Sequence, residues 1–199
     1  MKIRPLSIDG AWEVTPVQHG DPRGLFTEWY RFDHLAEAVG HPLRLAQGNL
    51  SVSARGVVRG IHFADVPPSQ AKYVMCVRGA VVDVIVDLRV GSPTYGQHEM
   101  VRLDDVDRRA VYIAEGLGHG FCALSDDATL TYLCSETFAP TREHAIHPLD
   151  PDLAIDWPAD SPQLSSKDAA APSLASALAD GTLPNYKECQ DYYALLNQV

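Results

Sequence analysis

The stretch Val57–Val74, VVRGIHFADVPPSQAKYV, decides how the rest of the sequence is interpreted. Apolar residues lead into Arg59-Gly60-Ile61-His62, a proline-rich turn follows, and Lys72 opens a second apolar run. The pattern predicts two strands joined by a tight loop, with the three basic side chains near the strand ends. A guanidinium for phosphate, an imidazole and an amine would then lie close together. Such a trio suits proton abstraction beside a carbonyl of an anionic substrate, whereas each residue alone is more often structural or solvated.

The chain has 199 residues and is expected to form one domain, 1–199, that buries its own core. Lys and Arg number 16 against 26 Asp and Glu, a net charge of -10 that disfavours nucleic acid and acidic membrane surfaces as partners. No apolar run approaches a membrane span, and the N-terminus MKIRPLSIDGAW lacks the apolar segment of a signal peptide. We therefore expect a cytoplasmic protein.

The four cysteines are scattered and form neither a CxxC pair nor a metal-binding spacing. Most of them lie in strand-like runs, so we expect buried free thiols in a reducing cytosol. They are Cys76, Cys122, Cys134 and Cys189.

Short β-branched runs separated by turns dominate the middle of the chain. They are Lys72–Val77, Ala80–Leu88, Gln97–Leu103, Ala110–Ile113, Gly120–Leu124 and Ala128–Cys134. Regular short strands with almost no helix predict an all-β sandwich or barrel, and a jelly roll fits the pattern.

The flanking segments add polar strands and a few helices. Leu25–Tyr30 alternates like a strand, and Asp33–Val39 predicts a short helix capped by Asp33 and ended by Gly40. Leu45–Ser53 alternates so that Gln47, Asn49, Ser51 and Ser53 share one face, which lines either a cavity or a solvent-exposed edge.

After Pro140 the pattern becomes irregular. The segments Pro172–Ala179 and Asn185–Leu196 predict two helices, a short C-terminal extension over about 172–197 that packs outside the barrel.

Small barrels of the cupin type often hold a metal through two histidines that flank one residue. In His62-Phe63-Ala64 the second of these positions is alanine, and the second motif offers only His119. One histidine from each motif does not close a typical site, so we expect no metal. The alternative is a metal held by His62, His119 and a distant carboxylate.

General acid–base chemistry is the class that remains, because the sequence has no G-x-S-x-G elbow and no glycine-rich phosphate loop. His62 is the candidate base and Asp168, in Ser-Lys-Asp, the carboxylate that could orient it. Tyr132 is the candidate acid, on a strand that faces the cavity. Taken alone, Tyr132 reads as a core tyrosine and Asp168 as the first turn of a helix.

Ten short motifs in order resemble those of the dTDP-4-dehydrorhamnose 3,5-epimerases, enzymes of deoxysugar biosynthesis. They are Asp21-x-Arg23-Gly24-x-Phe26-x-Glu28, Gln47-x-Asn49-x-Ser51-x-Ser53, Arg59-Gly60-Ile61-His62, Gln70-x-Lys72, Val82-Asp83-Val84, Asp87-Leu88-Arg89, Ser92-Pro93-Thr94-Tyr95-Gly96, Gly118-His119-Gly120-Phe121, Trp157-Pro158 and Ser166-Lys167-Asp168. The tail Leu183–Cys189 is similar to that of actinobacterial members in antibiotic sugar pathways.

The resemblance implies a cupin-type jelly-roll homodimer that needs no cofactor and acts on a substrate of dTDP-4-keto-6-deoxyglucose type. It implies that His62 removes the proton at C3, or C5, while Asp168 holds the imidazole. Lys72 would stabilise the enolate oxygen, and Tyr132 would return a proton from the opposite face.

The resemblance also implies the groups that bind the substrate. Arg59 and His119 would contact diphosphate or sugar oxygens, with three further side chains nearby. These are Gln47, Asn49 and Glu143. The nucleotide would be reached from the partner subunit by Arg23, Phe26 and Glu28.

Phe138 is the departure from the family pattern. Double epimerases commonly carry a tyrosine there, close to the ligand, and here the hydroxyl is missing. The expectation is therefore inversion at C3, with C5 open as a second centre. The alternatives are a 5-epimerase, a ketoisomerase of the same fold, or a sugar-nucleotide-binding cupin without activity.

Overall fold

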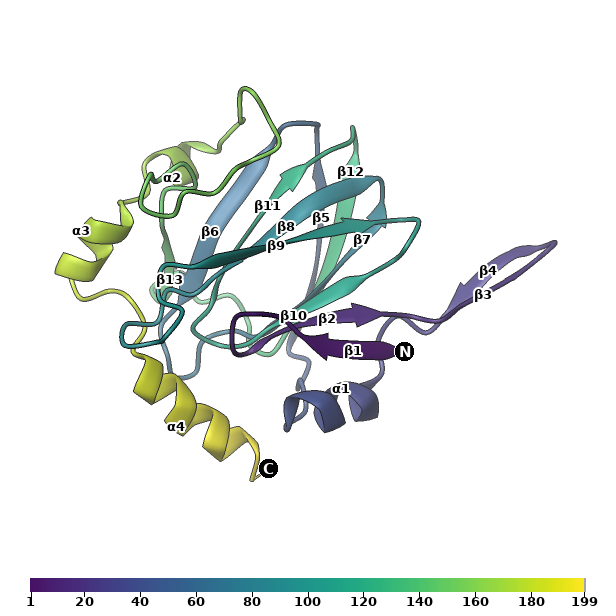
Figure 1. Cartoon of the computed structure of the whole chain (residues 1–199), viewed down its shortest axis with the longest axis horizontal. Helices are drawn as coiled ribbons and strands as arrows, with labels where there is room; N and C mark the ends of the chain where they lie inside the picture. The colour runs from purple at the N-terminus through teal and green to yellow at the C-terminus, as the bar shows by residue number, and fades with distance from the viewer. Residues whose placement is uncertain (199) are drawn as a thin grey trace.

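The computed structural model describes residues 1–198 as two antiparallel sheets that pack face to face. One has the strand order β1-β2-β10-β7-β12-β5, the other β13-β6-β11-β8-β9 (Figure 1). The first comprises β1 Lys2–Pro5, β2 Ala11–Thr15, β5 Gln47–Ser53, β7 Lys72–Arg78, β10 Ala110–Ile113 and β12 Ala128–Cys134. The second comprises β6 Val58–Ala64, β8 Ala80–Val86, β9 His98–Asp104, β11 Gly118–Ala123 and β13 Glu143–Ala145. The predicted all-β jelly roll is confirmed.

The five-stranded sheet is covered on both faces, which explains why β8 reads as the nearly continuous apolar run AVVDVIV. Val81 and Ile85 belong to the core between the sheets, whereas Val84 and Val86 pack in a second cluster with residues of the C-terminal segment 146–177. Because side chains alternate along a strand, Asp83 points with Val81 and Ile85 to the inner face. A carboxylate is thereby placed inside the barrel.

A glycine lets β6 and β11 approach each other closely just before His62. Gly60 has a φ of +114°, and a Cβ there would lie 2.6 Å from the carbonyl oxygen of His119. Only glycine fits this contact without displacing backbone. The register then pairs His62 with His119 across the two strands. The strand also begins two residues earlier than the predicted Gly120, so that His119 is part of it.

The predicted strand Leu25–Tyr30 is shorter than expected and belongs to neither large sheet. It is β4, Gly24–Thr27, and within residues 1–198 it pairs only with β3, Gln18–Asp21, in an arm that projects from the body (Figure 1). Thr27 pairs with Gln18, the first residue of β3, so β3 offers no further residue with which β4 could continue to pair.

The helix α1, Phe32–Val39, is present, but its predicted cap is wrong. Arg31 occupies the N-cap without a side-chain hydrogen bond, and Asp33 lies in the first turn, where its carboxylate pairs with Arg31 at 2.6 Å. The ion pair thus replaces the cap that Asp33 was expected to form. Gly40 ends the helix as predicted, with a φ of +99° and its N–H on Ala36 O.

The C-terminal helices lie outside the barrel, as predicted (Figure 1). The first, α3, is Leu174–Ala179, two residues later than the predicted start because Ser173 caps it. The last, α4, is Tyr186–Leu196, capped by Asn185. A helix of four residues, α2 Ser166–Ala169, carries Asp168 in its first turn, the position that the sequence indicated for this residue taken alone.

All four cysteines are buried and free, as predicted. Among residues 1–198, no helix is both long enough and apolar enough to cross a membrane.

Candidate active site

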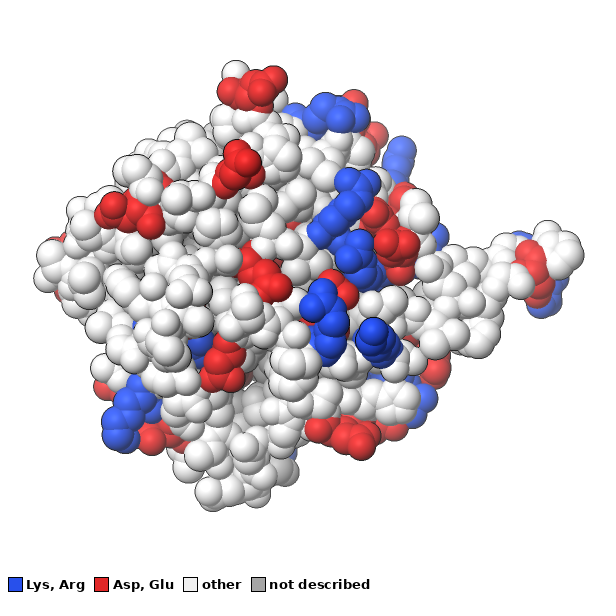
Figure 2. Space-filling view, in the orientation of Figure 1, with Lys and Arg blue, Asp and Glu red and all other residues white. Residues whose placement is uncertain are grey.

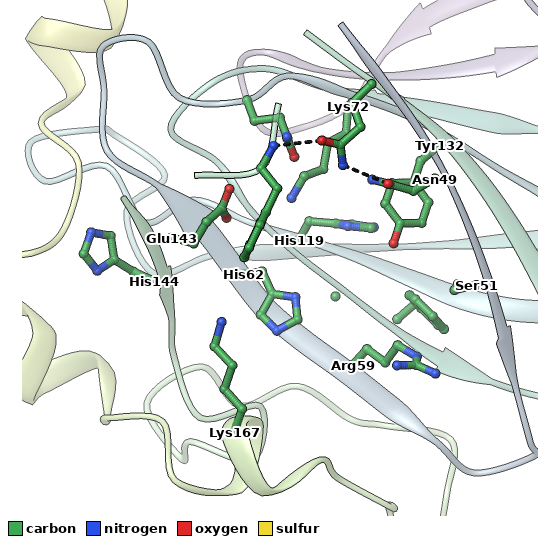
Figure 3. A pocket seen from close by; sticks show the side chains of 15 residues that line it. Asn49, Ser51, Arg59, His62, Lys72, His119, Tyr132, Glu143, His144 and Lys167 are labelled. Atoms are coloured by element: carbon green, nitrogen blue, oxygen red, sulfur yellow. Dashed lines mark hydrogen bonds between the residues drawn. The ribbon is translucent and has the colours of Figure 1, made fainter. Parts of the chain in front are cut away.

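A cavity of about 260 Å³ opens between the two sheets and is lined by most of the residues singled out from the sequence (Figure 3). From the six-stranded sheet come Gln47, Asn49 and Ser51 of β5, Lys72 of β7 and Tyr132 of β12. From the five-stranded sheet come Arg59 and His62 of β6, His119 of β11, and Glu143 and His144 of β13. The polar face of β5, an edge strand of its sheet, therefore lines a cavity, which decides between the two alternatives that the sequence left open.

His62 and Asp168 form a hydrogen-bonded pair at the cavity wall. His62 Nε2 lies 2.7 Å from Asp168 Oδ1, and the aspartate side chain is 4% exposed against 37% for the histidine. Burial alone raises the pKa of Asp168, but hydrogen bonds from His62, Ser165 and the Gly60 backbone hold it below its ordinary value. An ionised partner assigns the proton to Nε2 and leaves Nδ1 as the basic nitrogen.

Lys72 lies inside the cavity, opposite Cys134 in the ladder of β7 and β12. Burial lowers the pKa of this ammonium, and the nearby Glu143, Cys134 and Asp83 offset part of that shift. A desolvated ammonium in this position interacts strongly with any negative charge that develops beside it.

Tyr132 stands on the sheet opposite His62, with its hydroxyl toward the cavity (Figure 3). Burial raises the pKa of Tyr132, with a smaller increase from Cys134 and a decrease from Arg59. The phenol is therefore protonated at neutral pH and available as a donor.

His119 is paired as His62 is. Its Nε2 lies 2.8 Å from Oδ2 of Asp83, a carboxylate with no solvent exposure. The other oxygen, Asp83 Oδ1, has no hydrogen-bond partner in the described chain. This second dyad fixes the His119 ring in the wall of the cavity.

The remaining predicted binding residues differ in what they contact. Arg59 Nε donates to Ser53 Oγ at 3.0 Å, which fixes the guanidinium at the cavity edge. Gln47 is engaged within the protein, because its Oε1 accepts from Phe138 N at 2.8 Å. Phe138 lines the cavity and is 58% exposed.

The structure does not bring Arg23, Phe26 and Glu28 to the cavity of their own chain. Arg23 and Phe26 lie on the arm, with the Arg23 side chain 89% exposed and paired with Asp21 at 2.5 Å. Phe26 is 66% exposed. Glu28 follows the arm and pairs with Arg31 at 3.4 Å.

Sequence reasoning missed several lining residues, of which Lys167 is the most informative. Its ammonium extends from α2 toward His62 (Figure 3). Lys167 stood in the recognised Ser-Lys-Asp motif, and its position beside Asp168 was the available signal. Gln70 and His144 also line the cavity; Gln70 stood in the Gln-x-Lys motif.

At the position where a metal-binding cupin has its second histidine, Ala64 is buried next to the site. The residues that the structure describes contain no group of three or more His, Cys, Asp and Glu side chains that could hold a metal ion.

On the face drawn in Figure 2, Lys and Arg groups stand beside Asp and Glu groups, without a continuous basic surface.

Comparison with known sequences gives a family description, dTDP-4-dehydrorhamnose 3,5-epimerase, that matches residues 5–176. A dTDP-4-dehydrorhamnose 3-epimerase of Streptomyces niveus is 67% identical over 190 residues, covering 96% of this chain and 92% of the relative. A dTDP-4-dehydrorhamnose 3,5-epimerase of Mycolicibacterium smegmatis is 58% identical over 200 residues, covering 100% and 98%.

Two solved structures are similar over nearly their whole length. NovW, a 4-keto-6-deoxy sugar epimerase from the novobiocin gene cluster of Streptomyces spheroides, superposes with a TM-score of 0.94 at 67% identity and 96% coverage of both chains. ChmJ, a 3'-monoepimerase of Streptomyces bikiniensis in complex with dTDP-quinovose, gives 0.95 at 51% identity, covering 98% of this chain and 99% of ChmJ. The chain belongs to the dTDP-4-dehydrorhamnose 3,5-epimerase family, which includes 3-epimerases of antibiotic pathways.

Proposed function

We propose that this dTDP-4-keto-6-deoxysugar epimerase inverts C3 of its substrate, with His62 as base and Tyr132 as acid. The observation that carries the proposal is their placement on opposite walls, His62 on β6 of one sheet and Tyr132 on β12 of the other. A sugar ring held between them loses a proton on one face and regains one on the other. That order of events inverts the centre.

The proposed reaction uses only side chains of the cavity and proton exchange with solvent. The C3–H bond breaks, its proton passes to His62, and the electron pair moves into the C4 carbonyl to give an enolate. Lys72 and His119 stabilise the charge on the C4 oxygen. Tyr132 then protonates C3 from the opposite face, and proton exchange with solvent restores the phenol and the neutral imidazole.

Arg59 and Lys167 are the proposed partners of the diphosphate. Both are cationic side chains that line the cavity beyond His62 (Figure 3). Guanidinium and ammonium groups are the usual protein ligands of phosphate oxygens. They supply a binding site that is separate from the groups that move protons.

A second copy of the chain is proposed to complete the nucleotide site. The arm and the outer face of β5, β7 and β12 border an open, largely apolar groove of about 830 Å³, which includes Phe26, Leu50 and Val77. Exposed apolar surface of this kind is typical of a protein interface. In the proposed homodimer, Arg23, Phe26 and Glu28 of each arm reach the partner's site.

Four buried free cysteines fit a reducing compartment, so we place the reaction in the cytoplasm.

The test is solvent deuterium incorporation into dTDP-4-keto-6-deoxyglucose, followed by NMR in buffer that contains a chelator. We expect C3 to exchange faster than C5, because Phe138 lacks the hydroxyl of the double epimerases. His62→Asn should lower exchange by roughly a hundred- to ten-thousand-fold while nucleotide binding persists. Exchange at C5 alone would show that the chain is a 5-epimerase. Exchange at neither carbon would indicate a sugar-nucleotide-binding protein without activity. Loss of exchange in the presence of chelator would show that the reaction needs a metal ion.

A further inference from the structure

A second, smaller cavity lies beside the C-terminal helix α4. It has a volume of about 60 Å³, and its wall includes residues of the loop after α1, of β10, of the β10–β11 loop and of α4. Arg44 and Glu136, both exposed, also line it, so the cavity reaches toward solvent. The cavity therefore lies where the C-terminal helix meets the barrel.

Three buried polar side chains of this wall have an atom without a protein partner. His41 is 6% exposed, Tyr112 0% and Glu115 3%, and all three line the cavity. Within residues 1–198, His41 Nδ1, the Tyr112 hydroxyl and Glu115 Oε2 have no hydrogen-bond partner. Leaving a buried polar atom unpaired is costly, so such atoms are almost always bonded to protein or to ordered water. The cavity therefore needs an occupant that can form hydrogen bonds.

The three side chains belong to one cluster. The His41 ring meets the Tyr112 ring edge-on, with the centroids 6.4 Å apart, and burial, followed by the charge of Glu115, raises the pKa of Tyr112. Tyr193 of α4 stacks on His41 at 6.4 Å between ring centroids and donates to the carbonyl of Glu115. A single occupant can therefore link the same two residues that hold α4.

The charges of the wall favour a neutral occupant. Burial lowers the pKa of His41, so its imidazole is neutral at pH 7, and burial raises the pKa of Glu115 to about 7. An anion would be repelled by the carboxylate, and a cation would meet a carboxyl group that burial drives toward its neutral form. A neutral molecule that both donates and accepts hydrogen bonds fits all three groups.

We propose that this cavity is a binding site for a small cluster of ordered water molecules that bridges His41, Tyr112 and Glu115. A cavity of roughly 10–15 Å³ already holds one water, and a buried water typically makes about three hydrogen bonds. The volume of about 60 Å³ therefore accommodates a cluster, and the three atoms supply its protein partners. The site is separate from the proposed epimerase chemistry, and its test uses no substrate.

Urea unfolding at one protein concentration separates a hydrated cavity from a dry one. If water bridges the wall, Tyr112→Phe removes a satisfied hydrogen bond, and the urea midpoint should fall by about 0.3–1 M. In a dry cavity the same substitution removes an unpaired buried hydroxyl, so the midpoint should stay or rise. Tyr95→Phe is the matched control, since the Tyr95 hydroxyl also lacks a partner in the described chain but packs against the other core cluster. The proposal predicts a larger fall in Tyr112→Phe than in Tyr95→Phe.

Oxygen-17 magnetic relaxation dispersion counts the long-lived water molecules directly. A double variant with Tyr112→Phe and Glu115→Met leaves His41 as the only one of the three partners, so the count should fall by at least one. Glu115→Gln keeps a group that donates and accepts, and it should keep the parent count. Circular dichroism checks that each variant is folded, and the urea test, which needs only single substitutions, remains decisive if the double variant does not fold. Equal counts in the parent and the double variant, or a midpoint that Tyr112→Phe leaves unchanged or raises, would overturn the proposal.

Discussion

Tyr132 and His62 act on opposite faces of the sugar in the proposed mechanism. Removing the phenolic oxygen of Tyr132 should therefore stop the protonation step without stopping the deprotonation step. Tyr132→Phe removes the phenolic donor and keeps the ring that packs in the cavity. Deprotonation by His62 should continue, so deuterium should enter C3 with retention of configuration. NMR of the recovered sugar measures both label and configuration. Inversion at an undiminished rate would show that another group is the acid.

At the residue scale, the sequence indicated chemistry best where the spacing was local. Arg59, His62 and Lys72 were expected close together because two adjacent strands bracket a short loop, and all three line the cavity. Asp168 lies 106 residues from His62, so no local pattern could pair them. The sequence analysis named Asp168 only as a carboxylate that could orient His62, and the family resemblance implied the same role.

Gln47 shows a different limit. The alternation of β5 left its polar face open between a cavity and a solvent-exposed edge, and in the structure Gln47 lines the cavity. The contacts of its amide depend on the position of the loop that carries Phe138. Strand periodicity contains no information about that position, because the loop is distant in sequence.

At the element scale, α4 is held against the barrel by buried polar groups around the β10–β11 loop. Tyr193 of α4 donates to the carbonyl of Glu115, and Arg89, without exposed surface, contacts Tyr193 and lies over Tyr186. Glu115 is 3% exposed, and its Oε2 has no hydrogen-bond partner in the described chain. Burial raises the pKa of this carboxyl to about 7.

The raised pKa makes the stability depend on pH in a defined direction. Between the ordinary carboxyl pKa and about 7, the folded chain keeps a proton that the unfolded chain releases, so stability falls as pH rises through this window. Glu115→Gln removes that loss. The variant should be more stable than the parent by about 1–3 kcal/mol near pH 8 and nearly equal to it near pH 5.

Urea unfolding of both proteins at the two pH values, at one protein concentration, measures the difference. The same difference at both pH values would show that Glu115 acts through packing and not through its proton.

Elements were predictable where propensity and capping agreed, as in α4 with Asn185 at its N-cap. The cap of α1 was mispredicted because an ion pair between Arg31 and Asp33 competes with capping by Asp33. The four residues of α2 are too few for a periodic signal, although that turn carries Asp168.

At the scale of the whole molecule, the arm is the feature that a single chain leaves unexplained. In the part of the chain that the structure describes, its strands pair only with each other, and Leu25 and Phe26 remain exposed. Alternation predicted a strand here, but a strand of the body and a strand of a projecting arm have the same periodicity. Their difference lies in the partner surface.

The proposed exchange of arms predicts complementation between two inactive variants. Phe26→Ala impairs the site of the partner subunit, whereas His62→Asn impairs the site of its own. In a mixed dimer, one site then carries both substitutions, and the other has the native residue at both positions. With random association of equal amounts, half of the dimers are mixed, and about a quarter of the parent activity should return.

The measurement is C3 exchange by the two variants co-expressed and purified as a pair, against each variant alone. Size-exclusion chromatography with light scattering checks that the mixture contains dimers. An arm that served its own chain would give no intact site in the mixed dimer, since each subunit would carry one defect. Activity of the mixture would then equal the mean of the two variants, and the proposed exchange of arms would be wrong.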